Sequence, residues 1–225
     1  MKVISFSLWG DNTRYTLGAL QNASLAKIVY PDWVCRFYVG QSTPRLVVEM
    51  LKEFGNVEIV EMDEQGDWSG MFWRFSVASD PSVDAFIVRD CDSRLWFREK
   101  AAVDEWLASD KDFHIMRDNH QHGTSILGGM WGARNDLLSD MDQLLADYNK
   151  LDFWQVDQNF LRDVIYPRID VSAFVHDEFF EGKPFPTDRD ENHFVGQAYA
   201  GTGRVLHLDD VYFQDYMKEY YAKLL

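Results

Sequence analysis

The sequence has little cysteine and no long hydrophobic run. Its 225 residues include two cysteines, Cys35 and Cys91, which are too few for a disulfide framework. We therefore expect a protein of a reducing compartment, with the cytoplasm as the default location. No apolar run approaches the roughly 18 to 20 residues that a membrane span needs. Residues 1–6 resemble a first strand rather than a signal peptide, so we expect no transmembrane segment.

Basic residues are also scarce. The chain has 22 Lys and Arg against 37 Asp and Glu, a formal net charge of −15. A nucleic-acid partner is not expected, because a phosphate backbone needs a basic face. A nucleotide ligand remains compatible, because a metal ion can bring a diphosphate into an acidic site. No Gly-x-Gly-x-x-Gly or Gly-Lys-Ser/Thr motif follows the first expected strand, which argues against a dinucleotide or P-loop site.

The apolar pattern alternates between strand and helix periods. Hydrophobic residues make up 46% of the chain, enough for a substantial core. The pattern predicts strands over 2–9, 34–39 and 57–62, separated by helices over 15–30 and 44–54. This order predicts an α/β fold with a mainly parallel sheet. Without a linker or repeat, residues 1–225 are expected to form one domain. Further strands are expected over 83–88, 113–117 and 171–175, and helices over 68–75, 98–109, 136–148, 153–165 and 209–225.

Two carboxylates follow the apolar run that ends at Val88. Asp90 and Asp92 are spaced i, i+2, which places both on one side of an extended segment. Ligands of open α/β sheets bind at the carboxyl ends of strands. Two oxygen donors there suit Mg²⁺ or Mn²⁺, which bind through one or two carboxylates plus substrate phosphates. The alternative is a solvated turn after a strand.

Three further features each have two interpretations. The aromatic segment around Arg74 is a core helix with an arginine that reaches solvent, or part of a site. Gly128 and Gly129 mark a tight packing contact, or a place where a flat ligand lies against the main chain. Asp157 is the N-cap of the helix expected over 153–165, or a group that acts on substrate.

The order of these motifs resembles that of the GT-A glycosyltransferases and is similar to glycosyltransferase family 8. The matching segments, in chain order, are Phe72-Trp73-Arg74-Phe75, Asp90-Cys91-Asp92, Gly128-Gly129-Met130-Trp131-Gly132 and Asp157-Gln158. The chain departs from the family after His176, because Gly182-Lys183-Pro184-Phe185 follows at a longer and different spacing. The whole chain also resembles the small single-domain glycosyltransferases of viruses and bacteria.

The resemblance implies a GT-A, Rossmann-like fold with a mixed, mostly parallel sheet flanked by helices. It implies a hexosyltransferase that moves a sugar from a nucleotide-sugar donor, UDP-sugar first and GDP-sugar second, to a glycan or glycoprotein. Asp90, Asp92 and His176 would hold the metal ion, and the imidazole would favour Mn²⁺ over Mg²⁺. The alternatives are that Asp90 is a ribose or water partner and that His176 is a histidine with its hydrogen bonds satisfied at a strand end. The ion would neutralise charge on the leaving diphosphate.

The resemblance also suggests roles for other residues. Arg74 would pair with the Asp-x-Asp carboxylates or the donor sugar, and Asp157 and Gln158 would face the transferred sugar or the acceptor. By charge and position, Lys183 and Arg189 are candidates for the diphosphate. The base would lie near Leu8, Trp9 and Gly10. The Asp-Gln pair favours retention, whereas Asp118, Asp157 and Asp177 are candidate bases for inversion.

Two other classes compete with this hypothesis. A metal-dependent phosphohydrolase could use five side chains, Asp90, Asp92, Asp118, Asp157 and His176. A lectin-like binding module could stack sugars on the eight tryptophans.

Overall fold

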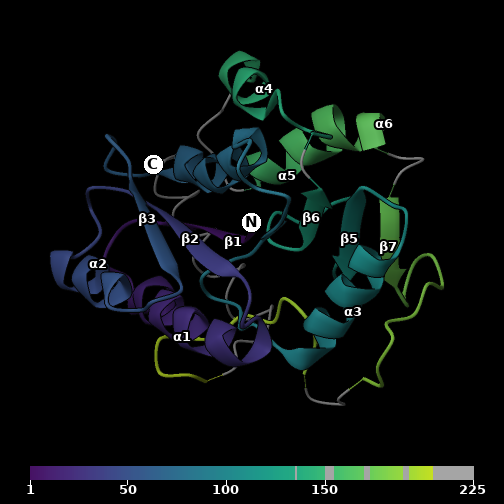
Figure 1. Cartoon of the computed structure of the whole chain (residues 1–225), viewed down its shortest axis with the longest axis horizontal. Helices are drawn as coiled ribbons and strands as arrows, with labels where there is room; N and C mark the ends of the chain where they lie inside the picture. The colour runs from purple at the N-terminus through teal and green to yellow at the C-terminus, as the bar shows by residue number, and fades with distance from the viewer. Residues whose placement is uncertain (135, 150–154, 170–172, 190–192, 205–225) are drawn as a thin grey trace, which may run out of the picture.

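A single mixed sheet organises the chain. The structure is a computed structural model that describes residues 1–134, 136–149, 155–169, 173–189 and 193–204. The sheet has seven strands in the order β3-β2-β1-β4-β6-β5-β7 (Figure 1). They are β1 (Lys2–Leu8), β2 (Val34–Val39), β3 (Val57–Glu61), β4 (Ala85–Val88), β5 (Phe113–Arg117), β6 (Trp131–Arg134) and β7 (Ala173–Asp177). β6 runs antiparallel to β4 and β5, and the other pairings of described strands are parallel. The expected mostly parallel sheet is confirmed.

Helices cover both faces of the sheet. On one face lie α1 (Thr13–Val29), α2 (Arg45–Lys52) and α3 (Phe97–Ala108). On the other lie the 3₁₀ helix η1 (Trp68–Ser79), α4 (Met141–Asp147), α5 (Val156–Phe160), the π-helical turn η2 (Leu161–Ile165) and α6 (Tyr166–Ile169) (Figure 1). Successive side chains of a strand point to opposite faces of the sheet, so a strand contributes to the packing on both faces. In β1, Ile4, Phe6 and Leu8 pack with the first group, whereas Val3 packs with the second.

Several element boundaries differ from the sequence prediction. The aromatic segment forms a 3₁₀ helix rather than an α-helix, and it extends to Ser79. The helix expected over 136–148 begins only at Met141, after a turn that includes Asp136 with a left-handed backbone (φ 75°). Within the helix expected over 153–165, the described residues form α5 from Val156 and then a π-helical turn. β7 continues to Asp177, two residues beyond the strand expected over 171–175, whose first two residues are outside the described ranges. The helix expected over 209–225 lies outside the described residues.

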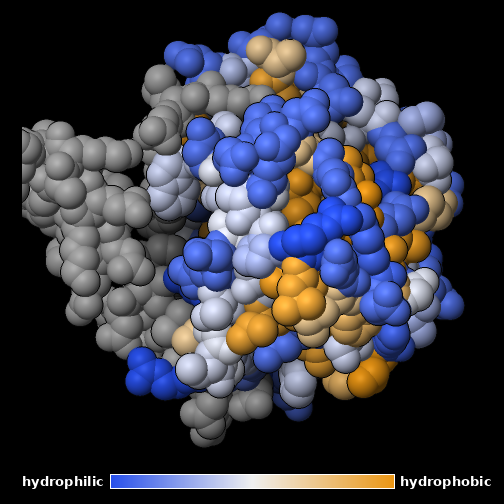
Figure 2. All heavy atoms as spheres, turned by 90° about the vertical axis from the view of Figure 1, so that its left-hand side faces the viewer, coloured by the Kyte–Doolittle hydropathy of each residue, from blue (hydrophilic) through white to orange (hydrophobic). Residues whose placement is uncertain are grey.

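The β3 side of the sheet is an edge protected by charge. Figure 2 shows this side of the molecule, where apolar and hydrophilic residues are interspersed. Glu58 on β3 pairs with Arg36 (2.8 Å), and Glu61 pairs with Lys52 of α2 (2.7 Å). Charged side chains along an edge strand disfavour pairing with another chain. Within the described ranges, none of the helices combines the length and apolar content that a membrane span requires.

A buried ion pair anchors the end of β4. Arg89 donates through Nε to Glu99 of α3 (3.1 Å) and through a terminal nitrogen to the carbonyl of Val88 (2.8 Å). The Tyr30 hydroxyl donates to the same carboxylate (3.0 Å). Burial raises the pKa of Glu99, and Arg89 opposes that rise. Since Arg89 immediately precedes Asp90, this pair fixes the point where the chain leaves the sheet.

Replacing Arg89 should therefore be costly. Arg89→Met would leave Glu99 buried without its cation, and we expect a loss of about 3–5 kcal/mol of unfolding free energy. Adding Glu99→Gln should recover much of the loss, because the uncompensated charge is gone. Urea unfolding measures the free energy of unfolding of the single and the double variant. Lys52→Met, which removes an exposed pair, is the control and should cost under about 1 kcal/mol. A loss for Arg89→Met as small as that of the control would contradict the anchoring role.

Candidate functional site

The centre of the site is a buried arginine between two carboxylates. Arg74 on η1 pairs with Asp90 after β4 and, through its other terminal nitrogen, with Asp157 of α5 (3.0 Å). The backbone of Arg74 is fixed from β1, because its N–H donates to Ser7 Oγ (3.0 Å) and its carbonyl accepts from Ser5 Oγ (2.6 Å). The pairing of Arg74 with the Asp-x-Asp segment, expected from the resemblance, is present.

The paired glycines leave room for these carboxylates. A β-carbon at Gly128 would overlap the Oδ2 atom of Asp157, and one at Gly129 would overlap the Oδ2 atom of Asp90. The main chain before β6 therefore lies directly against both acids. Of the two interpretations of the glycines, the tight packing contact is confirmed. The groups that pack against the glycines are the carboxylates of Asp157 and Asp90.

Burial and charge act in opposite directions on Asp157. Its side chain is buried, which raises its pKa, and the Arg74 guanidinium lowers it again. Asp157 is not the cap of α5. That position is Gln155, which has a left-handed backbone (φ 67°), and Asp157 instead accepts from the N–H of Gln158 (2.8 Å). The capping interpretation is therefore wrong in this structure.

Asp92 pairs with a second arginine that the sequence analysis missed. Arg14 lies in the first turn of α1, where its N–H donates to Oδ1 of the N-cap residue Asn12 (2.9 Å). Its guanidinium pairs with Asp92. Burial raises the pKa of Asp92, Arg14 lowers it and Asp90 raises it. The only sequence signal for Arg14 is the Asn cap after the first strand, which starts a helix at the same sheet edge.

Helix α1 supports the turn formed by Asp90-Cys91-Asp92. Asn22 donates to the carbonyl of Ser93 (2.9 Å) and accepts from the N–H of Leu95 (3.1 Å). A β-carbon at Gly18 would overlap the carbonyl of Cys91, so the helix packs directly against the turn. The N–H of Tyr199 donates to the carbonyl of Asp92 (2.9 Å). Asp92 is buried, so the interpretation as a solvated turn fails for this carboxylate, whereas the Asp90 side chain is exposed.

The residues expected near the base lie at the end of β1 and directly after it. The Leu8 side chain is buried in the core, and its carbonyl accepts from the Gly40 N–H (2.9 Å), so this residue presents no side chain to a ligand. Gly10 has a left-handed backbone (φ 70°), and its N–H donates to Ser42 Oγ (2.8 Å). The Trp9 ring is partly exposed and packs edge-on against Trp73. Of the three residues, Trp9 is the one able to contact a ring.

His176 does not join Asp90 and Asp92. Its Nδ1 is hydrogen-bonded to His114 Nε2 (2.8 Å), and its Nε2 is hydrogen-bonded to Glu105 (3.0 Å). With both ring nitrogens occupied and the side chain buried on the α3 face, it has no lone pair to offer a metal at the Asp-x-Asp turn. Among the described residues, no three His, Cys, Asp or Glu side chains are grouped closely enough to hold a metal ion.

Asp90 and Asp92 offer oxygen donors of the kind that a hard divalent ion uses, and in this structure Arg74 and Arg14 pair with them. The Asp90 side chain is 46% exposed, so it is accessible at the carboxyl end of β4. Asp92 lies two residues on, and the pair offers only oxygen donors. Mg²⁺ and Mn²⁺ need no more than one or two protein carboxylates when substrate phosphates complete their coordination. The Mn²⁺ preference that rested on an imidazole ligand no longer follows.

Asp118, Lys183 and Arg189 also lie apart from the acidic turn. Asp118 is fully buried. Its carboxylate accepts hydrogen bonds from Nε and one terminal nitrogen of Arg98 (3.0 Å each) and from the N–H of Val195 (3.0 Å). Arg189 donates to the Asp118 carbonyl (2.6 Å). The Lys183 amine pairs with Glu181 (2.7 Å). Since Asp118 is saturated by cations and N–H donors, it is a structural anchor in this structure rather than an accessible base.

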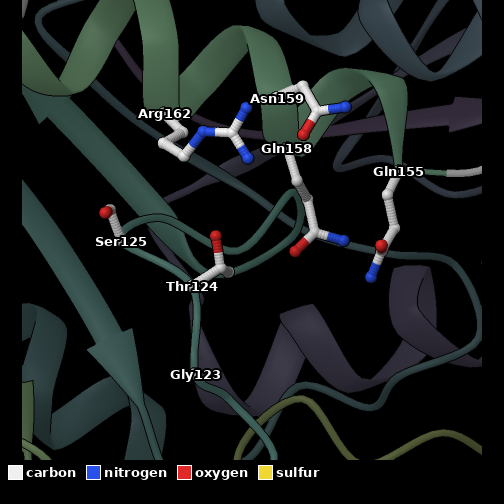
Figure 3. A pocket seen from close by; sticks show the side chains of 7 residues that line it. All are labelled: Gly123, Thr124, Ser125, Gln155, Gln158, Asn159 and Arg162. Atoms are coloured by element: carbon white, nitrogen blue, oxygen red, sulfur yellow. The ribbon is translucent and has the colours of Figure 1, made fainter.

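Gln158 lines a cavity beside the arginine network. The cavity has a volume of about 330 Å³ and is lined by Gly123, Thr124, Ser125, Gln155, Gln158, Asn159 and Arg162. Figure 3 shows Gln155 and Gln158 reaching from the start of α5 toward the loop that carries Thr124. Asp157 points to Arg74 while its neighbour Gln158 faces the cavity, so the adjacent pair connects the network to an open polar space.

Comparison with known proteins identifies the fold. No protein-family model matches the sequence, and no curated protein sequence matches it. A glycosyltransferase involved in glycosylation of the major capsid of PBCV-1 aligns with TM-score 0.53 and 16% identity, covering 79% of this chain and 82% of that one. The Pyrobaculum calidifontis mannosyltransferase aligns with TM-score 0.53 and 12% identity, covering 79% of this chain and 55% of that one.

A third likeness reaches beyond sugar transfer. The 4-diphosphocytidyl-2C-methyl-D-erythritol synthase from Anaerococcus prevotii aligns with TM-score 0.52 and 11% identity, covering 84% of this chain and 90% of that one. At these identities the likenesses show the fold alone. The GT-A, Rossmann-like fold expected from the sequence is confirmed. Membership of family 8 in particular is not.

The close approach of the glycines can be tested. Gly129→Ala should cost roughly 1–3 kcal/mol of unfolding free energy, because the new methyl group must displace the Asp90 carboxylate. The matched control is Gly55→Ala, where an added β-carbon meets nothing within 4 Å. The control should stay within about 0.5 kcal/mol of the parent. Equal urea midpoints for the two variants would contradict the packing described for Gly129.

The buried histidine pair should make the fold acid-sensitive. Burial lowers the pKa of His114, and His176 and Arg89 lower it further. Burial also lowers the pKa of His176, against the opposing effect of Glu105. The unfolded chain therefore takes up these protons first, and stability should fall as pH drops below about 6.5. His114→Phe should flatten that dependence by up to about 1.4 kcal/mol per pH unit. His120→Asn, at an exposed histidine, should leave it unchanged. Identical pH slopes for parent and His114→Phe in urea unfolding would contradict the assignment.

Proposed function

We propose that this chain is a metal-dependent glycosyltransferase that moves a sugar from a nucleotide-sugar donor to a glycan or glycoprotein acceptor. One observation carries the proposal. In a GT-A sheet, Arg74 joins the partly exposed Asp90 at the carboxyl end of β4 to Asp157, whose neighbour Gln158 lines a polar cavity. The donor side and the acceptor side of the site would thus both adjoin the buried guanidinium of Arg74.

The donor side would occupy the carboxyl ends of β1, β2 and β4. The base would contact Trp9 and the main chain around Gly10, at the crevice where ligands of such sheets bind. Asp90 and Asp92 would hold Mg²⁺ or Mn²⁺ together with the donor diphosphate. When bound, the ion would neutralise the charge that develops on the leaving diphosphate. The mannosyltransferase among the structural likenesses is a complex with GDP-Man and Mn²⁺, which supports a metal-bound donor.

The positive groups have different roles in this proposal. Arg14 lies next to Asp92 and would face the diphosphate from the first turn of α1. Lys183 and Arg189 remain candidates for the same task only if they leave Glu181 and Asp118, their present partners. Arg74 would orient Asp90, and Asp157 would hold Arg74 in place as a positioning residue. UDP-sugar remains the first donor to try, and GDP-sugar the second.

The acceptor side would be the cavity at Gln158. Its amides and hydroxyls can donate to and accept from sugar hydroxyls, as sugar recognition requires. Gln158 would contact the acceptor or the transferred sugar. Three points remain predictions from the sequence: the stereochemistry of sugar transfer, the single domain over residues 1–225 and the cytoplasmic location.

The competing classes have less support in the structure. The phosphohydrolase hypothesis needs Asp118 and His176 beside Asp90, but Asp118 is enclosed by Arg98 and Arg189, and His176 is bonded to His114. The lectin hypothesis needs exposed tryptophans, and of the tryptophans that the structure describes, Trp96 alone is exposed. A nucleotidyltransferase is a second candidate, favoured by the likeness to the synthase from Anaerococcus prevotii.

Donor binding should depend on the metal. Calorimetry with UDP and GDP should show binding in Mn²⁺ or Mg²⁺ that weakens at least about fivefold in excess EDTA, because the ion bridges carboxylate and diphosphate. Asp92→Asn should lose donor turnover, because the substitution keeps the size of the side chain but removes the charge that would hold the ion, while the amide oxygen can still accept from Arg14. Asp104→Asn, at an exposed acid, is the control.

Each outcome separates the hypotheses. Release of UDP or GDP from the matching nucleotide sugar, with sugar transfer detected by mass spectrometry, identifies a glycosyltransferase. Release of pyrophosphate from CTP or UTP and a sugar phosphate identifies a nucleotidyltransferase. Equal nucleotide affinity with and without EDTA would remove the metal from the proposal. Failure to bind any nucleotide would remove the donor site altogether.

A further inference from the structure

Two exposed phenylalanines stand on the loop after β7. Phe179 is 43% exposed and Phe180 is 51% exposed, so two aromatic rings lie side by side on the surface. The Phe179 ring already has polar neighbours, because the Arg189 guanidinium lies 4.8 Å from its centroid and His120 packs edge-on against it. Phe180 is therefore the more available of the two aromatic surfaces.

The loop that carries Phe180 is built to be rigid. The N–H groups of Phe179 and Phe180 both donate to Asp177 Oδ1 (2.9 Å each). The loop is closed by two main-chain hydrogen bonds between Asp177 and Lys183 (2.5 and 2.7 Å), and Gly182 supplies the left-handed residue of the turn (φ 64°). An exposed ring on a fixed loop loses little conformational entropy when it binds a ligand.

One buried arginine joins this loop to the cavity wall. Arg117 donates through Nε to Asp177 Oδ2 (2.7 Å) and through a terminal nitrogen to the carbonyls of Thr124 (3.3 Å) and Ser125 (3.1 Å). A β-carbon at Gly123 would lie 3.8 Å from the Phe180 ring, so the ring reaches the residue that begins the cavity wall. Phe180 thus stands at the rim of the cavity, in a fixed position relative to it.

The chemistry of the cavity indicates a neutral ligand. Three amides and two hydroxyls line it, and its single charged group, Arg162, already pairs with Asp163 through two hydrogen bonds (2.7 and 2.9 Å). A carboxylate or phosphate on the ligand would have to compete with Asp163. Sugar hydroxyls would not, because amides and hydroxyls both donate and accept.

We propose that Phe180 is a stacking platform for the acceptor, which is a neutral glycan of at least two sugar units. One unit would occupy the cavity at Gln158, and the next would lay its apolar C–H face on the Phe180 ring. This subsite rests on the proposed glycosyltransferase function, since it completes the acceptor side of the same site. It predicts that a single sugar binds more weakly than a disaccharide.

The experiment compares glycans of different length on three variants. A glycan array of neutral and acidic oligosaccharides identifies the ligand, and calorimetry then compares the best disaccharide with the methyl glycoside of its cavity-bound unit. Phe180→Ala should weaken the disaccharide roughly tenfold and leave the methyl glycoside unchanged, because burial of one aromatic face is lost. Phe180→Trp should preserve disaccharide affinity. Phe97→Ala, which removes a ring that is 56% exposed at the start of α3, is the matched control and should have no effect.

Several results would overturn the proposal. Equal loss for monosaccharide and disaccharide would make Phe180 a structural residue, and a preference for acidic glycans would contradict the neutral cavity. No binding to any neutral glycan of two or more units would eliminate the subsite. If Phe180→Ala instead abolished a dimer seen by analytical ultracentrifugation, the ring would belong to an interface between two copies. UDP and GDP binding, measured on the same variants, tests the donor site separately, so its failure would count against the glycosyltransferase and not against the platform.

Discussion

The shared arginine is the interaction on which the site depends. Arg74 holds two acids that come from segments far apart in the sequence, one after β4 and one in α5. Asp157 is buried, and without a cation it would be costly to keep charged there. The arginine is in turn fixed by two serines of β1, on the strand face that would otherwise be apolar. Strand, 3₁₀ helix, acidic turn and α5 therefore have to assemble together, and the glycines before β6 give the carboxylates their space.

Much of this arrangement could be predicted from the sequence, because it depends on local patterns. The β-rich run over 2–9, the apolar run that ends at Val88 and the helical period over 15–30 lead directly to the layered fold. The Asp-x-Asp turn follows a buried strand, as expected, and the sequence motifs mark both Arg74 and Asp157 as candidate site residues. The paired glycines also pointed to a close approach of the main chain. What approaches them could not be deduced, because the approaching groups are Asp157 and Asp90, which are distant in the sequence.

The failures have a common physical origin. His176 and Asp118 have the residue types of a metal ligand and a base, but tertiary packing gives each of them a full set of protein partners. Residue type and position at a strand end do not reveal which face a side chain occupies or whether its lone pairs are already used. Arg14 shows the converse case. It carries no motif, yet it lies beside Asp92 because the Asn12 cap starts α1 at the same sheet edge.

The adjacency of Asp157 and Gln158 has a thermodynamic consequence. A ligand that competes for Asp90 shifts the charge balance around Arg74, and Asp157 is the other acid on that guanidinium. Gln158 accompanies Asp157 at the start of a helix of five residues, and it forms part of the cavity. Any effect that occupation of one side has on the free energy of occupying the other would act by the same amount in both directions. The two substrates of such a site would communicate through a single side chain rather than through movement of a domain.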